Sequence, residues 1–181
     1  MNINKLEASW RVAELNPTDT LRRVGFDENS VLCDIGAGTG LFTIPAAVIT
    51  DNKVFAIEIK PDLIEILVSK AEKESLSNLV PLLTNGFNYN IEDKIVDFVL
   101  MVTVFHEIAE KSSLLNEIKR IMTEDGKLVL IEFHKNKTPL GPPVSHRIGK
   151  DEAISICKDY GLSKNMEFSL GDNFYCIVFS K

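Results

Sequence analysis

The segment VLCDIGAGTG, residues 31–40, joins a short apolar run to three glycines at alternate positions. The apolar run at 31–35 is typical of a parallel strand that is buried on both faces. Glycine has no Cβ atom and permits positive φ, so the backbone at Gly36, Gly38 and Gly40 can approach a ligand closely. The apolar spacing after Gly40 indicates a helix, whose first N–H groups would point toward the same place. The segment therefore predicts a strand, a ligand-binding turn and a helix, in that order.

Strands and helices alternate on either side of this segment. Apolar patterns predict further strands at 53–59, 79–83, 96–102 and 127–133, and helices at 17–25, 41–49, 61–76, 112–122 and 152–160. A turn at Asp125-Gly126 precedes the strand at 127–133, and a terminal hairpin is expected from the runs 164–170 and 174–179. This order predicts an α/β fold: a Rossmann-like, doubly wound, seven-stranded sheet that is mostly parallel and ends in an antiparallel hairpin.

Composition narrows the class of protein. The 181 residues suit a single domain, 1–181, and the net charge of −6 disfavours nucleic acid, whose binding depends on neutralised phosphates. A local basic cluster is the one exception, formed by Lys135, Lys137, Arg147 and Lys150. We find neither an apolar signal-peptide core near the start nor an apolar stretch long enough to span a membrane. The three cysteines form no C-x-x-C pair, so we expect a cytoplasmic protein without disulfides, whose oligomeric state stays open.

Two details separate the glycine turn from a dinucleotide site. A G-x-G-x-x-G fingerprint would require glycine at position 41, where the chain has Leu41. Asp34 stands two residues before Gly36, where a carboxylate is awkward beside a pyrophosphate but suits a ligand with an ammonium and a sulfonium. Asp34 has an alternative role as a cap for the glycine turn. Glu58 ends the next strand, where a carboxylate can accept hydrogen bonds from both hydroxyls of a ribose.

Several segments together resemble class I methyltransferases that use S-adenosylmethionine. Residues 31–40 resemble the first motif of this class, and Ala56-Ile57-Glu58 resembles its second-strand acidic motif. Asp97-Phe98-Val99-Leu100 resembles the fourth strand, and residues 119–128 resemble the approach to the fifth. The resemblance covers roughly residues 18–181. Two segments, 104–108 and 138–143, are similar to the ubiquinone/menaquinone-biosynthesis and type 11 branch of small-molecule methyltransferases.

The resemblance implies S-adenosylmethionine as cofactor and a role for each matching residue. The cofactor's methionine part would be held by Asp34, Gly36, Ala37, Gly38, Thr39 and Gly40, above Val102 and Thr103. The ribose would be held by Glu58, with Ile59 and Lys60 beside it, and the adenine by Asn85, Gly86 and Phe87. Many members of the class have Asp where Asn85 stands. The methyl acceptor would be a small molecule that the sequence does not identify.

Candidates on the acceptor side are fewer. His106 follows the fourth strand and would face the methyl group as a base, or else pack against the next helix. Glu132 is either an acid that faces the substrate or an ordinary charge at a strand end. Weaker candidates are His134, His146, Tyr89 and Tyr175. The histidines are scattered, so we expect no metal site.

Two segments would border the cavity: a lid at 1–16 and a substrate-side loop at 135–150, which is long and rich in proline. Two alternatives to a methyltransferase remain open. One is an NAD-dependent oxidoreductase of Rossmann type, which Leu41 and Asp34 disfavour. The other is a module that binds S-adenosylmethionine without catalysis, because the sequence shows no obvious base.

Overall fold

The computed structural model describes residues 6–138 and 141–181. Seven strands form one sheet in the order β3-β2-β1-β4-β5-β7-β6. They are β1 (Leu32–Ile35), β2 (Val54–Glu58), β3 (Leu79–Leu83), β4 (Val96–Val102), β5 (Met122–Phe133), β6 (Ser163–Leu170) and β7 (Phe174–Ser180). The first five strands pair in parallel, whereas β7 runs antiparallel to both β5 and β6. The predicted fold class is confirmed.

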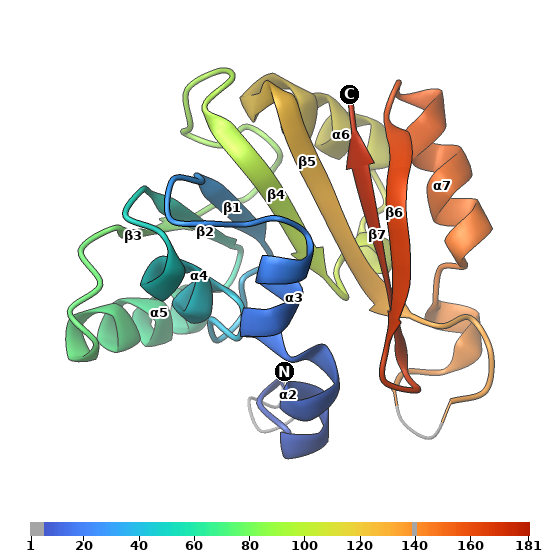
Figure 1. Ribbon diagram of the computed structural model, residues 1–181, viewed down its shortest axis with the longest axis horizontal. Helices are drawn as coiled ribbons and strands as arrows, with labels where there is room; N and C mark the ends of the chain where they lie inside the picture. The colour runs from blue at the N-terminus through green and yellow to red at the C-terminus, as the bar shows by residue number, and fades with distance from the viewer. Residues whose placement is uncertain (1–5, 139–140) are drawn as a thin grey trace.

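Helices cover both faces of the sheet (Figure 1). They are α2 (Ser9–Leu15), α3 (Pro17–Arg23), α4 (Thr43–Ile49), α5 (Pro61–Lys73), α6 (Lys111–Ile121) and α7 (Lys150–Asp159), with 3₁₀ turns η1 (Phe105–Glu107) and η2 (Val144–His146). Figure 1 shows α3, α4 and α5 on one face and α6 and α7 on the other, so two apolar cores form, one on each side. None of the helices in the described ranges is long and apolar enough to cross a membrane.

A loop replaces a helix between β3 and β4. Residues 84–95 carry Tyr89 and Ile91 into the core beside α6, where both side chains are buried. Arg120 of α6 donates hydrogen bonds to the backbone oxygens of both residues, and Glu117 accepts one from the N–H of Tyr89. Because one helix satisfies the backbone of the loop, the chain reaches β4 without a helix of its own.

Two local predictions need correction. The predicted helices begin only at residue 17, but Ser9–Leu15 is also helical: Trp10 stacks on Phe174, with ring centroids 5.9 Å apart, and Leu15 is fully buried. The stacking partner of Trp10 comes from the distant β7, so the local pattern does not reveal the helix.

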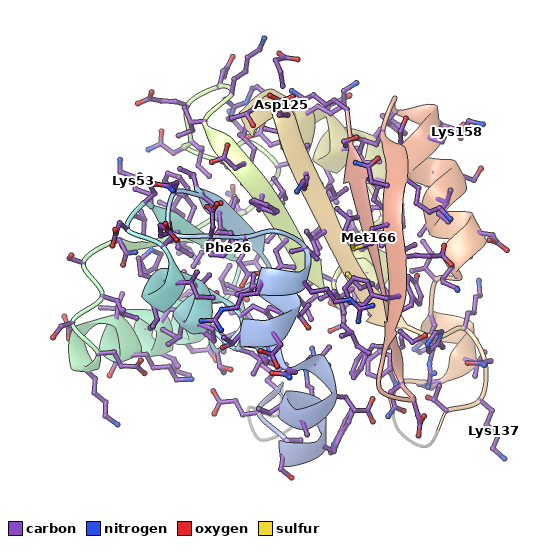
Figure 2. The ribbon with its side chains drawn as sticks, in the orientation of Figure 1. Phe26, Lys53, Asp125, Lys137, Lys158 and Met166 are labelled. Carbon is purple, nitrogen blue, oxygen red and sulfur yellow. The ribbon has the colours of Figure 1, made fainter. Side chains whose placement is uncertain are left out.

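The turn at Asp125-Gly126 is a bulge inside β5 instead of a break before it. Met122 pairs with Val96 and Lys127 with Phe98, so four residues of β5 oppose a single residue of β4. A Cβ atom on Gly126 would lie 3.1 Å from the backbone oxygen of Val96, which explains glycine there. Asp125 marks this end of the sheet, far from α2 (Figure 2).

Candidate functional site

A cavity of about 350 Å³ lies at the carboxyl ends of β1, β2 and β4. This is where ligands bind in open parallel sheets, because the strand order reverses beside β1. All but two of the residues predicted to bind the cofactor line the cavity; Gly40 and Asn85 do not. Its size lies at the lower end of the range for small-molecule sites, on the order of 300–1,000 Å³.

The glycine turn shapes the floor of the cavity. All three glycines have positive φ: +75° at Gly36, +60° at Gly38 and +90° at Gly40. A Cβ atom on Gly36 would lie 2.5 Å from Cγ2 of Val104, so glycine there lets β1 approach the segment after β4. A Cβ atom on Gly40 would lie 3.0 Å from carbons of Ile44 and Leu67, so this glycine permits helix packing and does not face a ligand.

Asp34 lies beneath the turn and is 3% exposed. Its carboxylate accepts a hydrogen bond of 2.6 Å from the hydroxyl of Thr43 on α4, instead of capping the glycine turn as in the alternative considered above. Burial raises the pKa of Asp34 to about 7; the Thr43 hydrogen bond opposes the shift and the nearby Glu58 carboxylate adds to it. A ligand that places a cation beside Asp34 would favour its ionised form.

Glu58 connects the end of β2 to the glycine turn. One carboxylate oxygen accepts a hydrogen bond of 3.0 Å from the N–H of Gly38, and the other accepts bonds from the N–H groups of Ile59 and Lys60. The side chain is 6% exposed and lines the cavity. Each carboxylate oxygen has two lone pairs, so the oxygen bonded to Gly38 retains capacity for a ligand hydroxyl.

The loop after β3 supplies a different set of residues from the predicted one. Gly86 and Phe87 line the cavity as expected, but Asn85 is exposed and does not. Thr84 lines it instead, and its hydroxyl donates a hydrogen bond of 2.9 Å to the backbone oxygen of Gly86. Asn85 was assigned from the resemblance to the family motif, and such a resemblance does not show which side chain of an irregular loop faces the cavity.

His106, which is partly buried, and Glu132, which is fully buried, form a pair beside the cavity. Nδ1 of His106 lies 2.8 Å from Oε2 of Glu132, and the other carboxylate oxygen accepts the backbone N–H of His106. The Glu132 side chain is only 1% exposed, so it supports His106 and does not face a substrate. Its hydrogen bond raises the pKa of His106 above the usual value, because it stabilises the imidazolium.

The pairing also fixes the orientation of the imidazole. With Nδ1 held by Glu132, Nε2 lies 3.9 Å from a carboxylate oxygen of Glu107. Glu107 lines the cavity, as does Val104 on the other side of η1, whereas His106 itself is not in the lining. In the imidazole ring, Nδ1 is therefore bonded to Glu132, and Nε2 lies on the side of Glu107.

The weaker candidates have different surroundings. The ring of His134 packs on Tyr175, and burial lowers the pKa of this histidine. The hydroxyl of Tyr175 donates to the backbone oxygen of Ile148, and His146 is exposed in η2. Tyr89 is the one member of this group that lines the cavity.

The N-terminal segment lies over the cavity, where a lid was predicted; its first five residues are outside the described ones. Leu6 and Arg11 line the cavity. Glu7 pairs with Lys70, which also donates a hydrogen bond of 2.8 Å to the backbone oxygen of Thr39. Further along, Glu14 accepts two hydrogen bonds from Asn173 in the turn between β6 and β7.

The loop at 135–150 is organised around an arginine. Arg147 is 6% exposed and donates to the backbone oxygens of His134, Asn136 and Pro142. None of the loop's described residues lines the cavity; Pro139 and Leu140 lie outside the described residues. Two lysines of the basic cluster predicted in this region form ion pairs, Lys135 with Glu152 and Lys150 with Glu167. Lys137 projects outward from the molecule (Figure 2).

The cavity fits the cofactor that the sequence implies. Its lining combines a glycine-rich backbone turn, two carboxylates for cationic and hydroxyl groups, and the buried hydroxyl of Thr39, which is near the Glu7 carboxylate but forms no hydrogen bond of ordinary geometry with the described residues. A buried hydroxyl without a partner is costly, and a ligand atom would satisfy it. No cluster of His, Cys, Asp or Glu suited to a metal ion occurs in the described part of the chain.

Comparison with known proteins identifies the family. A model of the methyltransferase domain family matches residues 26–172. The chain belongs to this family. The match confirms the predicted resemblance, and it supports S-adenosylmethionine over NAD as the cofactor. An S-adenosylmethionine-dependent methyltransferase from Aquifex aeolicus has the same fold over 98% of this chain and 95% of its own, with a TM-score of 0.92 and 25% identity.

Curated relatives cover a narrower part of the chain. A demethylmenaquinone methyltransferase from Tropheryma whipplei is 28% identical over 75% of this chain and 53% of its own. A tRNA(Phe) (4-demethylwyosine(37)-C(7)) aminocarboxypropyltransferase from Methanocaldococcus jannaschii is 33% identical over 50% of this chain and 38% of its own. The chain spans about half the length of the curated relatives it matches. The second relative acts on RNA, so family membership alone does not exclude a nucleic-acid acceptor.

Proposed function

We propose that this protein transfers a methyl group from S-adenosylmethionine to a small molecule that carries an acidic hydroxyl group. The observation that carries the proposal is the convergence of Asp34, the glycine turn and Glu58 on one cavity in a member of the methyltransferase family. Asp34 would pair with the ammonium group of the amino-acid part, and Glu58 would accept a hydrogen bond from a ribose hydroxyl. Thr84, Gly86 and Phe87 would border the adenine.

Methyl transfer requires only two contributions from the protein. S-adenosylmethionine supplies a methyl group that is already activated, so the enzyme has to align the acceptor and remove its proton. His106 is suited to the second task, because Glu132 holds Nδ1 and stabilises the imidazolium that forms when Nε2 takes a proton. A base of this kind is required for a hydroxyl acceptor, such as a phenol or hydroquinone, and not for an acceptor that is already an anion or a free amine.

A small-molecule acceptor also agrees with the surface. The chain is acidic, with a net charge of −6, and the two lysines with nearby carboxylates, Lys135 and Lys150, have reduced capacity for phosphate. The demethylmenaquinone methyltransferase relative supports a small-molecule acceptor. Buried, free cysteines at positions 33, 157 and 176 support our proposal that the protein acts in the cytoplasm.

The experiment is a transfer assay with S-adenosylmethionine labelled in its methyl group. The acceptors are a panel of hydroquinones and phenols, a matched panel of amines and thiols, and unmodified tRNA. We expect label in the hydroxyl-bearing group alone, with transfer that rises with pH as His106 loses its proton. Label in tRNA, or preferential transfer to amines, would contradict the proposed acceptor class. Binding of the cofactor with transfer to none of the panels would favour a non-catalytic module.

A further inference from the structure

An arginine on α2 lines the cavity with an incomplete set of partners. Arg11 is 7% exposed, and its Nη2 donates a hydrogen bond of 2.9 Å to the hydroxyl of Thr103 at the end of β4. Its Nε is buried and has no hydrogen-bond partner among the described residues. A buried donor without an acceptor costs about 1–3 kcal/mol, so such a position is typical of a group that binds a ligand.

No acid of the described chain forms a hydrogen bond with this guanidinium. Glu132 is close enough to raise the pKa of Arg11, but both of its carboxylate oxygens bind His106. Burial lowers the pKa of Arg11 to about 10, so the side chain keeps its charge at neutral pH. On another side lies the ring of Phe174, 5.5 Å from the guanidinium carbon, which contributes a cation–π contact but no acceptor oxygen. Arg11 thus remains a buried cation with capacity for an anion.

The position of Arg11 in the cavity indicates which anionic group of the ligand it binds. Leu6, from the same segment, lies 3.5 Å from where a Cβ atom of Gly38 would be, so the segment covers the glycine turn. Glu58 marks the ribose end of the cavity, and Arg11 contacts Thr103 at the end of β4, beside the turn. The amino-acid end of the cofactor carries an ammonium and a carboxylate. Asp34 can match the ammonium, and the carboxylate requires a cation.

We propose that Arg11 binds the carboxylate of the cofactor's methionine moiety, so that α2 forms part of the cofactor site. The inference rests on the cofactor given in the proposed function. A guanidinium is suited to the task, because its planar donors match a carboxylate and form two parallel charge-assisted bonds. Lys60, the other cation of the lining, stands two residues after Glu58 and donates its backbone N–H to that carboxylate, so it is placed at the ribose end.

The test distinguishes the contribution of the ligand's carboxylate to the affinity from that of the rest of the ligand. Calorimetry measures the affinity of the wild type and of Arg11→Met for S-adenosylhomocysteine and for S-adenosyl-3-thiopropylamine, the same molecule without its carboxylate. We expect Arg11→Met to weaken binding of the first ligand by roughly 10- to 100-fold and of the second by no more than about twofold. Arg11→Lys, which keeps the charge without the planar donors, should lie between. Arg22→Met, at an exposed arginine of α3, is the matched control and should change neither affinity.

Other outcomes contradict the proposal in distinguishable ways. Equal losses for both ligands would assign Arg11 a purely structural role in seating α2. Unchanged binding of S-adenosylhomocysteine with a raised KM for the acceptor would assign the arginine to the acceptor instead. If wild-type protein bound neither ligand, the proposed function would fail as well. Thermal unfolding of Arg11→Met checks that it folds, and Arg11→Gln replaces it in the same comparison if it does not.

Discussion

The two sides of the cavity differ in how the chain builds them. The donor side, formed by Asp34, residues 36–39 and Glu58, relies on backbone N–H groups and on carboxylates at strand ends. The acceptor side, where His106 and Glu132 lie beside the cavity, relies on a side chain whose partner comes from a neighbouring strand. The donor side recognises a ligand common to a large family, whereas the acceptor side has to fit one substrate. Differences among members of the family should therefore concentrate on the acceptor side.

The largest expected effect is on the acceptor side. His106→Ala should lower kcat by roughly 10²- to 10⁴-fold, the usual contribution of a general base, and change the affinity for S-adenosylhomocysteine by less than about twofold. Activity of the wild type should rise with pH through a pKa above 6.5, because Glu132 raises that of His106 and only the neutral ring accepts a proton.

Glu132→Gln provides the matched variant for this histidine. It removes the charge that raises the pKa of His106, so the pH profile should move to lower pH. A profile that stays in place, or full activity of His106→Ala, would show that another group takes the proton.

The next effect in size is on the donor side. Glu58→Ala should weaken binding of S-adenosylhomocysteine by roughly 10- to 100-fold, because it removes the acceptor for the ribose and leaves the N–H of Gly38 without its partner. Calorimetry measures the loss, and Asp62→Ala, at an exposed carboxylate four residues later, is the control. Wild-type affinity in Glu58→Ala would refute the donor-side assignment.

Asp34 should show opposite effects on stability and on binding. Its pKa rises from 3.8 in the unfolded chain to about 7 in the ligand-free fold. Ionising this buried group therefore costs stability as pH increases from about 4 to 7. Asp34→Asn removes that cost, so it should raise the free energy of unfolding by about 1–3 kcal/mol at pH 8 and leave it unchanged near pH 4. Urea denaturation at both pH values measures the difference.

The same Asp34→Asn variant should bind S-adenosylhomocysteine more weakly than the wild type, because the amide cannot match the ammonium. A variant that loses stability at pH 8, or that binds the ligand as tightly as the wild type, would contradict a role in matching a cation.

The smallest effect concerns the cover formed by residues 6–16. The ion pair between Glu7 and Lys70 is partly exposed, so water screens it and Glu7→Gln should change cofactor affinity by less than about threefold. Stopped-flow measurement of ligand dissociation would detect a faster opening of the cover. A loss as large as that of Glu58→Ala would mean that this ion pair contributes as much binding free energy as Glu58 does.

Much of the fold could be predicted from the sequence, because buried parallel strands and glycine turns have strong local patterns. β3 and β4 begin and end at the predicted residues, and the parallel pairing of the first five strands follows from the alternation with helices. Glu58 could be found because a strand end fixes where its carboxylate lies. Gly40 shows the limit of this reasoning: its positive φ was implied, but its contact with Leu67 depends on how α5 packs.

The acceptor side and the cover could not be predicted to the same degree. Arg11 lies 92 positions from Thr103, and Glu14 lies 159 positions from Asn173. No periodicity or spacing connects residues so far apart. The pairing of His106 with Glu132 was also missed, although each residue was singled out alone. His106 follows the end of β4, and Glu132 lies near the end of the neighbouring β5; this shared position is the signal that could have joined them.

The claim that the donor side selects S-adenosylmethionine is tested most directly by calorimetric titration of the wild-type protein with S-adenosylmethionine, S-adenosylhomocysteine and NAD under one condition. Asp34 and Glu58 lead us to expect binding of the first two at one site and none of NAD, whose pyrophosphate would lie beside a buried carboxylate. Binding of NAD without binding of S-adenosylmethionine would contradict this account of the cavity.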